Sequence, residues 1–441
     1  MNKTMNLSTL ETRLSEALSD LCGHYVDARE PYCDDDEAWL SLSDETGARF
    51  VSTQEELDSV RRSCRLLSLY NEFAVNAHEN RINFLVGSGH KYTAVPRKGR
   101  RPSQELLDQT DEFLYDFAEA NHWHARQQEI VHRMDRDGEV FIRLFPDSDG
   151  MTRIRFIDPE LIHSPNGQTN HRPGERFGIE FDPQDAETVC GYWIDNCYVD
   201  SCFVQHRKAN VDANVPRGLP LFFPVRKNLR RAEKLLRNMS VVAEIQSAIA
   251  IIRRHQTGNV SAVERFLNNQ MNASGQDGFL PGVSQYGPGT ILDTSSAVDY
   301  QFPVAAIDAS RYVTVLQAEL RAIAARLVMP EFMLTSDASN ANYASTMVAE
   351  GPAVRMFDRL QHELACEDAA LIKTAIRHAT ETGRLPKETL TNVDVRAVAP
   401  NLAVRNRLDE TRADKILLDA GVMSKRTMAL RNNLDPSEID A

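Results

Sequence analysis

The sequence predicts an α+β fold that is predominantly helical, and three observations support this. Apolar residues recur at steps of three and four, as on one face of a helix, most clearly over 53–86, 307–329 and 344–382. Short segments rich in β-branched and aromatic residues lie between about 138 and 210. With 441 residues, 42% of them hydrophobic, the chain is long enough for two or three domains with buried cores.

The N-terminal half is expected to be helical on either side of its β segments. Leu7 to Leu21 predicts a short amphipathic helix, followed by an acidic stretch, Cys33 to Glu37, that we interpret as a solvated loop. Longer helical blocks cover 53–86 and 103–134. Two hairpins are predicted after them: Glu139 to Phe145 with Arg153 to Ile157, and Gly178 to Phe181 with Val189 to Ile194.

The C-terminal half alternates long helices with polar segments. A helical pattern from Leu221 to His255 is followed by 256–303, which is rich in Gly, Asn, Ser and Gln. Helix returns from Ile307 to Met329 and ends at Pro330, and a polar loop runs from Thr335 to Tyr343. The remaining elements are a helix over 344–382 with a kink expected at Gly351-Pro352, a strand Val393 to Val398, a helix Leu402 to Ala420 stopped by Gly421, and a final helix capped by Ser424.

The charge balance argues against a protein that grips nucleic acid over its whole surface. There are 50 basic and 63 acidic side chains, a formal net charge of −13. Affinity for phosphates comes from Lys and Arg that displace counterions, so a basic excess is typical of such proteins. Either nucleic acid is not a ligand, or it passes without being held, or a local basic surface serves it.

Seven cysteines scattered over a long chain indicate a reducing compartment rather than a disulfide framework. Residues 1–10 contain one Lys and no apolar core, so no secretory signal is expected. No run approaches the roughly 18 apolar residues that span a bilayer. We expect a soluble intracellular protein.

Two groups of residues could hold a metal, and both have a simpler interpretation. Cys190, Cys197, Cys202 and His206 are of the types that bind zinc, but their spacings lack a C-x-x-C knuckle, so we favour small buried side chains. Asp135, Asp137 and Glu139 alternate, and a solvated hairpin tip is favoured over a Mg²⁺ site.

We expect neither an enzyme nor a cofactor site. His122 and His124 cannot chelate from one helix face and are interpreted as structural or exposed. No zinc-protease, nucleophile-elbow or phosphate-loop motif occurs. The densest basic stripe is Arg226, Lys227, Arg230, Arg231, Lys234 and Arg237, which is either a solvated or subunit-contacting helix face or a phosphate contact.

Six segments, in order along the chain, resemble the portal protein family of tailed double-stranded DNA bacteriophages. These are Arg65 to Glu72 leading to Val86-Gly-Ser-Gly89, Asp137 to Ile142 with Phe156 to Ile162, Arg217-Gly-Leu-Pro220, Val328 to Leu334, Ser339 to Ser345, and Ala420 to Thr427. They run from about 55 to 435, and the first 50 residues match nothing in the family.

The resemblance implies a ring-forming subunit at a capsid vertex, with a dodecamer expected. It implies an unassigned segment 1–50, a wing with the β element over 51–220, stem helices 221–255 and 304–329, a clip 256–303, a tunnel loop 330–345, a long kinked helix 346–385 and a C-terminal wing or crown 386–441. On this mapping the tunnel loop faces DNA with Ser336, Asp337, Ser339, Asn340, Asn342 and Tyr343. The clip offers Gly282, Gln285, Tyr286 and Gly287 to partner proteins, and Arg226, Arg230, Lys234 and Arg237 are expected to contact phosphate or a neighbouring subunit.

The partners implied by the resemblance are further copies of the chain, double-stranded DNA in the channel, the terminase large subunit, the head–tail connector, and the major capsid and scaffold proteins, without a membrane. The location implied is the virion vertex, and the host cytoplasm during assembly. An acidic channel would repel the duplex and let it slide. The alternatives are a head–tail adaptor, which would be shorter, and a metal-dependent phage enzyme, which would need clustered acids or histidines.

Overall fold

The computed structural model describes residues 53–165, 174–255, 290–295, 309–337, 339, 343–400, 402 and 407–431. The chain divides into two compact units, 1–60 and 61–441. In the first unit the described residues form the initial turns of helix α2 (Gln54–Tyr70). The helix expected over Leu7 to Leu21 and the acidic stretch after it lie outside the described residues.

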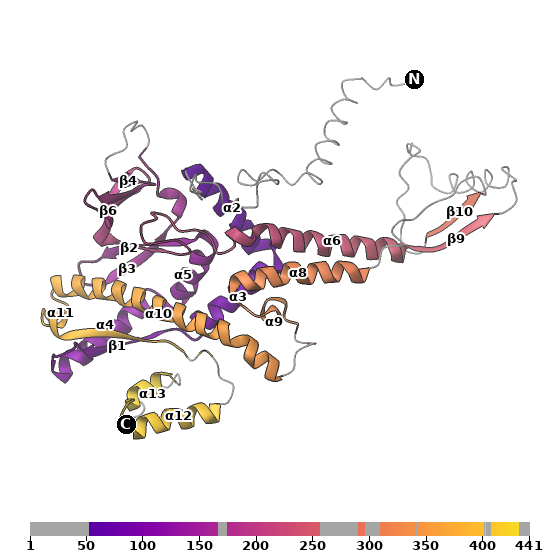
Figure 1. Cartoon of the computed structure of the whole chain (residues 1–441). Coiled ribbons are helices and arrows are strands. Elements are labelled where there is room, and N and C mark those ends of the chain that lie inside the picture. Colours follow the sequence, from indigo (N-terminus) through magenta and orange to yellow (C-terminus); the bar gives the residue numbers. More distant parts are fainter. Residues whose placement is uncertain are drawn as a thin grey trace, which may run out of the picture. The chain divides into compact units, whose positions relative to one another are not determined.

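Each of the two N-terminal helical blocks is divided in two, where one pattern was expected to continue (Figure 1). The first block gives α2 and α3 (Glu72–Leu85), because Asn71 adopts an extended conformation and its side chain accepts a hydrogen bond from the Ala74 amide. The second gives α4 (Gln104–Ala120) and α5 (Trp123–Asp137). Between them His122 takes a left-handed φ of 50°.

The predicted β element is confirmed as two small antiparallel sheets. One has the strand order β3-β2-β8, with β2 (Glu139–Pro146) central, β3 (Thr152–Ile157) and β8 (Val204–Lys208). The other is β4-β5-β6-β7, comprising β4 (Glu175–Arg176), β5 (Ile179–Asp182), β6 (Asp185–Ile194) and β7 (Cys197–Asp200). Both predicted hairpins therefore form.

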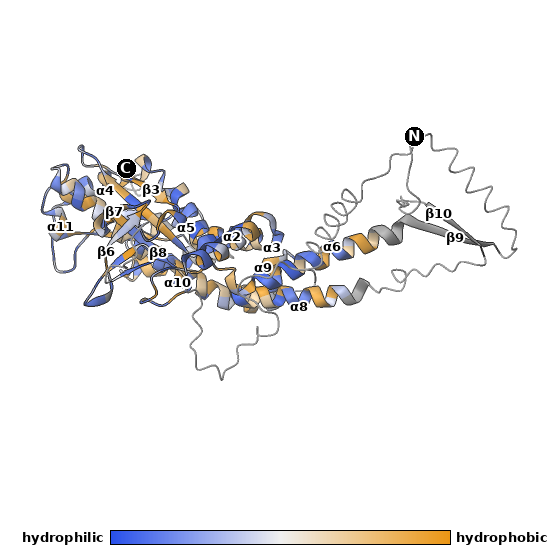
Figure 2. Cartoon of the chain, turned by 90° about the horizontal axis from the view of Figure 1, so that it is seen from above, coloured by the Kyte–Doolittle hydropathy of each residue, from blue (hydrophilic) through white to orange (hydrophobic). Residues whose placement is uncertain are grey.

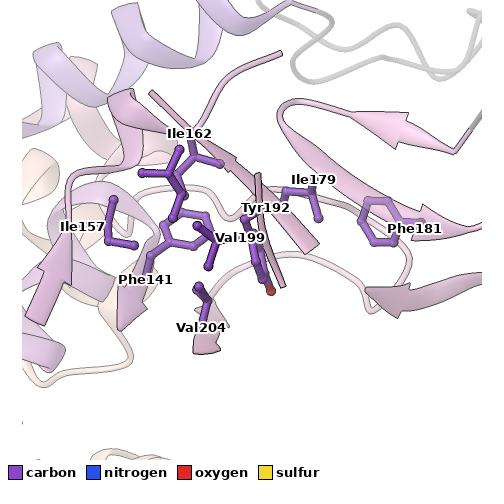
Figure 3. Close-up of a cluster of buried hydrophobic side chains, with 9 residues drawn as sticks. Phe141, Ile157, Ile162, Ile179, Phe181, Tyr192, Val199 and Val204 are labelled. Carbon is purple, nitrogen blue, oxygen red and sulfur yellow. The ribbon is translucent and has the colours of Figure 1, made fainter. Parts of the chain in front are cut away.

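One hydrophobic cluster joins these two sheets (Figure 3). Every member is at most 9% exposed, so each contributes about 1.5–3 kcal/mol when an aliphatic or aromatic side chain is fully buried. The strands alternate inward and outward residues, which places one row of each strand in the cluster. Its members are Phe141, Ile157, Ile162, Ile179, Phe181, Tyr192, Ile194, Val199 and Val204.

A strand that the sequence did not predict pairs with one that it did. β1 (Lys91–Pro96) runs antiparallel to β11 (Val393–Val398), which forms at the predicted residues. The sequence predicted β11 from its own alternating residues. β1 has its partner about 300 residues away in the sequence, so no neighbouring strand indicated it.

The second half contains the long helices. α6 (Arg226–Ala248) is shorter than the helix expected over 221–255, because Ile249 to His255 forms strand β9 (Ile249–His255), parallel to β10 (Thr290–Ser295). β-branched Ile249, Ile251 and Ile252 favour a strand here. The remaining helices are α8 (Ala309–Leu327), α9 (Glu331–Thr335), α10 (Tyr343–Glu381), α11 (Thr389–Asn392), α12 (Arg407–Asp419) and α13 (Lys425–Arg431).

The helix expected over 344–382 forms as one continuous helix, α10, with Pro352 inside it, and the kink expected at Gly351-Pro352 stays a prediction. The predicted signals at the ends of the last two helices are confirmed. Gly421 follows α12 with a φ of +70°, and the Ser424 hydroxyl accepts a hydrogen bond from the Thr427 amide at 3.1 Å, capping α13. Among the residues with a described placement, no helix is both long and apolar enough to cross a bilayer.

Candidate channel elements and their anchoring

Helices α6 and α8 run side by side in opposite directions (Figures 1 and 2). The predicted row on α8 is buried: Leu316, Leu320, Ile323 and Leu327 are at most 8% exposed. From α6, Leu229 and Ala232 are fully buried. The Asn228 side chain donates to Glu319 Oε2 at 2.6 Å, which fixes the register of the pair.

The distal part of this helix pair exposes apolar side chains. Exposed fractions are 36% for Leu236 and 46% for Val241 on α6, and 40% for Val313 and 52% for Val315 on α8. Figure 2 shows hydrophobic residues along both helices. Single exposed apolar residues are ordinary, but several on two adjacent helices indicate a surface that another molecule covers.

The basic stripe of α6 is not a uniform exposed face. Arg226 is 7% exposed, donates to the Phe223 carbonyl at 2.6 Å and stacks on the Phe223 ring, so it is not part of a solvated face in the single subunit. It lies three residues before Leu229 and so shares the buried side of the helix. Arg230 donates to Ser63 Oγ at 2.9 Å. Lys234 is exposed, and Arg237 is 74% exposed beside Glu233 at 3.3 Å.

The segment between α8 and α10 begins with a short helix rather than a loop. α9 is anchored by α3: the Asn76 side chain donates to the carbonyls of Met333 and Leu334, both at 2.7 Å, and Asn80 donates to Met333 at 2.9 Å. These bonds satisfy the carbonyls at the C-terminal end of α9. Ser336 ends the helix with a left-handed φ of 57°.

The polar residues after α9 are exposed where they are described. Ser336, Asp337 and Ser339 lie at the surface, and the Ser339 amide donates to Asp337 Oδ1 at 2.9 Å. Hydrogen bonds from Ser339 lower the pKa of Asp337, so its carboxylate keeps its charge. Tyr343 starts α10. Asn340 and Asn342 lie outside the described residues, as do the clip residues Gly282, Gln285, Tyr286 and Gly287.

A cavity of about 470 Å³ lies at the base of this segment. Residues of α3, α9 and α10 line it, among them Phe84, Phe332 and Phe357. The rings of Phe84 and Phe357 stack with centroids 4.7 Å apart. The segment therefore starts on α9, which α3 anchors by hydrogen bonds, and ends on α10, which contacts α3 through these two rings.

Asp135, Asp137 and Glu139 are buried, which corrects their interpretation as a solvated hairpin tip. They are at most 3% exposed and occupy the end of α5 and the start of β2. Each has a cationic partner: Arg81 Nε lies 2.7 Å from Asp135, and Arg65 Nε lies 2.6 Å from Asp137. Buried carboxylates are stable only when paired in this way.

Glu139 is the centre of a cluster that reaches the start of the helix pair. It accepts hydrogen bonds from Arg61, from Arg217 Nε at 2.8 Å and from the Gly218 amide at 2.9 Å, and His206 Nε2 lies 3.0 Å away. Arg217 also donates to the carbonyls of Pro159, Ile162 and Phe177. The segment that leads into α6 is thereby tied to both sheets.

The charges around Glu139 favour its ionised form. Burial would raise the pKa of Glu139, but the charges of Arg217 and Arg61 outweigh burial and hold that pKa well below its usual value. Burial lowers the pKa of His206, against its bond to Glu139, so the imidazole is neutral. Two features of the sequence could have indicated this cluster. Arg61 lies on an apolar helix face, and the acidic residues Asp137 and Glu139 flank Gly138.

A second buried cluster fixes α10. Asp368, fully buried in that helix, accepts hydrogen bonds from Tyr92, from Gln127 Nε2 at 2.9 Å and from Arg207 NH1 at 2.8 Å. These partners come from β1, α5 and β8. Sequence reasoning missed Asp368, because its partners are scattered over the chain.

The residues of the zinc candidate do not form a buried group. Cys190 is half-buried and Cys197 and Cys202 are exposed, contrary to the burial expected for them. His206 is directed to Glu139. Among the described residues, no group of three or more His, Cys, Asp or Glu is placed to hold a metal ion. His122 and His124 are exposed.

Solved structures resemble this chain at low sequence identity. The neck of an empty GTA particle, computed with C6 symmetry, has a TM-score of 0.46 and 12% identity, covering 86% of this chain and 94% of that chain. An HK97 family phage portal protein from Corynebacterium diphtheriae has a TM-score of 0.31 and 14% identity, with 79% and 95% covered. The neck of a native GTA particle, computed with C12 symmetry, has a TM-score of 0.41 and 13% identity, and the match covers 88% of this chain and 95% of that chain.

No curated protein matches the sequence significantly. The model of one protein family does match, that of the phage portal protein, lambda family, over residues 46–361. This match covers most of the chain, and it spans the β element, the helix pair, α9 and the first half of α10. The chain belongs to the lambda family of phage portal proteins.

Proposed function

We propose that this protein is the subunit of a ring of twelve copies at a capsid vertex, through which double-stranded DNA is packaged and later ejected. Its role is structural rather than catalytic. During assembly in the host cytoplasm it meets the scaffold and major capsid proteins. The ring docks the terminase large subunit first and the head–tail connector afterwards.

The family match is the observation that carries this proposal, and the exposed apolar residues of the helix pair support it. Val241 and Val315 are about half exposed in the isolated subunit, although both lie on well-formed helices. Packing against adjacent copies would bury them. A head–tail adaptor would also oligomerise, but the lambda portal family match favours the portal.

In this proposal the stem is the helix pair, the clip lies between its two helices, and the segment after α9 is the tunnel loop. The wing contains the β element, and the crown is the C-terminal part from residue 386. The exposed carboxylate of Asp337 would form a ring of charges that repels phosphates and keeps the duplex centred. Asn340 and Asn342 would offer brief hydrogen bonds to phosphate oxygens.

Two measurements test the proposal. Native mass spectrometry of the purified protein, with negative-stain imaging, is expected to find rings of twelve with a central hole. A subunit that stays monomeric at all concentrations and salt conditions, or that cleaves DNA in the presence of metal, would contradict it.

The second measurement concerns the tunnel loop. Proheads that carry Asp337→Lys are expected to package DNA more slowly at low salt, since a cation would attract the phosphates where DNA is closest. Asp212→Lys, the same charge change at an exposed site before α6, is the matched control. Equal packaging rates for the two variants would show that the loop does not face the DNA.

A further inference from the structure

Near its turn, the β2–β3 hairpin carries three arginines, Arg143, Arg153 and Arg155, which we name the arginine face; Phe141 and Ile157, farther from the turn on the same face of the sheet, are buried in the apolar cluster. Arg143 lies directly opposite Arg155, and Phe145 lies opposite Arg153. Residues opposite one another share a face of the sheet, and like charges there repel. Phe145 is 42% and Arg153 60% exposed.

The arginine face has little negative charge to balance it within the described part of the subunit. Arg143 stacks on the Phe145 ring at 4.9 Å, and Arg155 donates to the Ile154 carbonyl at 2.6 Å. Among the described residues, Arg153 alone of the three approaches a carboxylate, that of Asp147 at 3.9 Å. The face is therefore suited to an acidic surface outside the subunit.

Helix α4 presents such a surface. Its sequence has six acidic residues and no basic one. Glu105, Glu112 and Glu119 recur every seven residues, so they lie along one face; all are exposed, and none has an ion-pair partner among the residues described. Tyr115, 70% exposed, is on the same helix. We name these four residues the acidic stripe.

Among the described residues, no ion pair joins the arginine face to the acidic stripe. Phe156, on the opposite face of β3, is covered by Arg126 and Arg133 of α5. α4 packs against α5 and β1 (Figure 1), and the side chain of its C-cap, Asn121, exchanges hydrogen bonds with the backbone of Thr152 and Ile154 in β3. The two surfaces are not paired within the described part of one subunit, whereas a second copy offers each of them a complementary partner.

We propose that the acidic stripe of one copy docks on the arginine face of the next, as a head-to-tail contact repeated around the ring. This inference rests on the proposed function and names a surface that holds the ring together. A contact between two different surfaces closes into a ring when the rotation between copies allows it. Each charged surface then gains the partner that the described part of its own subunit does not provide.

The geometry of the two surfaces is compatible. Seven residues of helix advance about 10 Å and two residues of strand about 7 Å, and flexible Arg and Glu side chains span the difference. Tyr115 and Phe145 add one aromatic ring from each side. DNA is the less suitable occupant, because three arginines on a chain of net charge −13 are few for a protein that grips a duplex.

The test uses two full-length variants with reversed charges. One carries Arg143→Glu and Arg155→Glu, and the other Glu112→Arg and Glu119→Arg. In native mass spectrometry at low salt, each alone is expected to assemble at least ten times more weakly than wild type. An equimolar mixture is expected to restore rings with equal numbers of the two variants, because each then offers the complementary surface to the other.

The control is Arg176→Glu with Lys387→Glu, which makes the same charge change at exposed sites outside both surfaces, and it should assemble like wild type. If charge reversal prevents folding, Arg143→Gln with Arg155→Gln replaces that variant and should by itself weaken assembly.

Normal rings from either reversed variant would overturn the proposed interface but not the portal function. The same holds if the two variants melt like wild type and mixing them does not restore rings. Wild-type subunits that never associate would contradict both. A short DNA duplex that binds wild type but not the arginine variant, with rings intact, would assign the arginine face to nucleic acid instead.

Discussion

The β element and the helix pair of α6 and α8 differ in how completely a single subunit buries their apolar side chains. In the β element, the apolar cluster around Phe141 is at most 9% exposed and the carboxylate of Glu139 has cationic partners within the same chain. In the helix pair, Leu320 is buried but Val315, five residues earlier, is 52% exposed. The β element buries its cluster within one subunit, whereas in the proposed ring the helix pair would gain its remaining burial from adjacent copies.

The largest expected effect is on the stability of the β element. Arg217→Ala leaves the Glu139 carboxylate buried with fewer partners, and should reduce the free energy of unfolding by about 3–5 kcal/mol. Urea denaturation measures it. The matched control is Arg237→Ala, because Arg237 is 74% exposed and should change the free energy by less than about 1 kcal/mol. Similar losses for both variants would show that the buried cluster contributes no special stability.

The next prediction sharpens the division within the helix pair. Leu320→Ala should destabilise the dissociated subunit by about 2–5 kcal/mol, since it creates a cavity between α6 and α8. Val315→Ala should leave that free energy nearly unchanged and weaken assembly instead. Urea denaturation below the assembly concentration and mass photometry above it separate the two effects. Assembly unaffected by Val315→Ala would place this residue outside the subunit contact.

The free energy of unfolding should depend on pH through the β element. Burial lowers the pKa of His206, so the folded state binds fewer protons than the unfolded state once pH falls below about 6.5. The stability from the neutral imidazole is complete above that pH and is lost as pH falls toward the lower pKa of the folded state, by about 1.4 kcal/mol per pH unit between the two pKa values. His206→Gln should reduce the slope of unfolding free energy against pH between about 7 and 5. His362→Gln, at an exposed position, should leave it unchanged.

The smallest effect concerns the C-terminal helices. Ser424→Ala removes the bond to the Thr427 amide and should cost about 1 kcal/mol, confined to α13. Hydrogen exchange is expected to rise in Lys425–Arg431 and to stay constant in the β element. A global rise in exchange would mean that α13 is coupled to the main core.

The sequence alone determined the features whose physics is local. Apolar periodicity predicted α8 and the buried row from Leu316 to Leu327, alternation predicted both hairpins, and Gly421 and Ser424 marked helix ends through their own backbone and side-chain chemistry. The ordered set of short segments, including Arg217-Gly-Leu-Pro220, indicated the portal family that the family match confirmed.

Tertiary structure decided everything that depends on partners distant in the sequence. The same acidic residue type is solvated at one position and buried at another, and only folding placed Arg61 and Arg217 on Glu139 and Arg207 on Asp368. The pairing of β1 with β11 and the burial of Arg226 have the same origin. A charge or a strand edge is satisfied by whichever group lies within a few ångströms, and sequence spacing does not encode that distance for residues far apart in the chain.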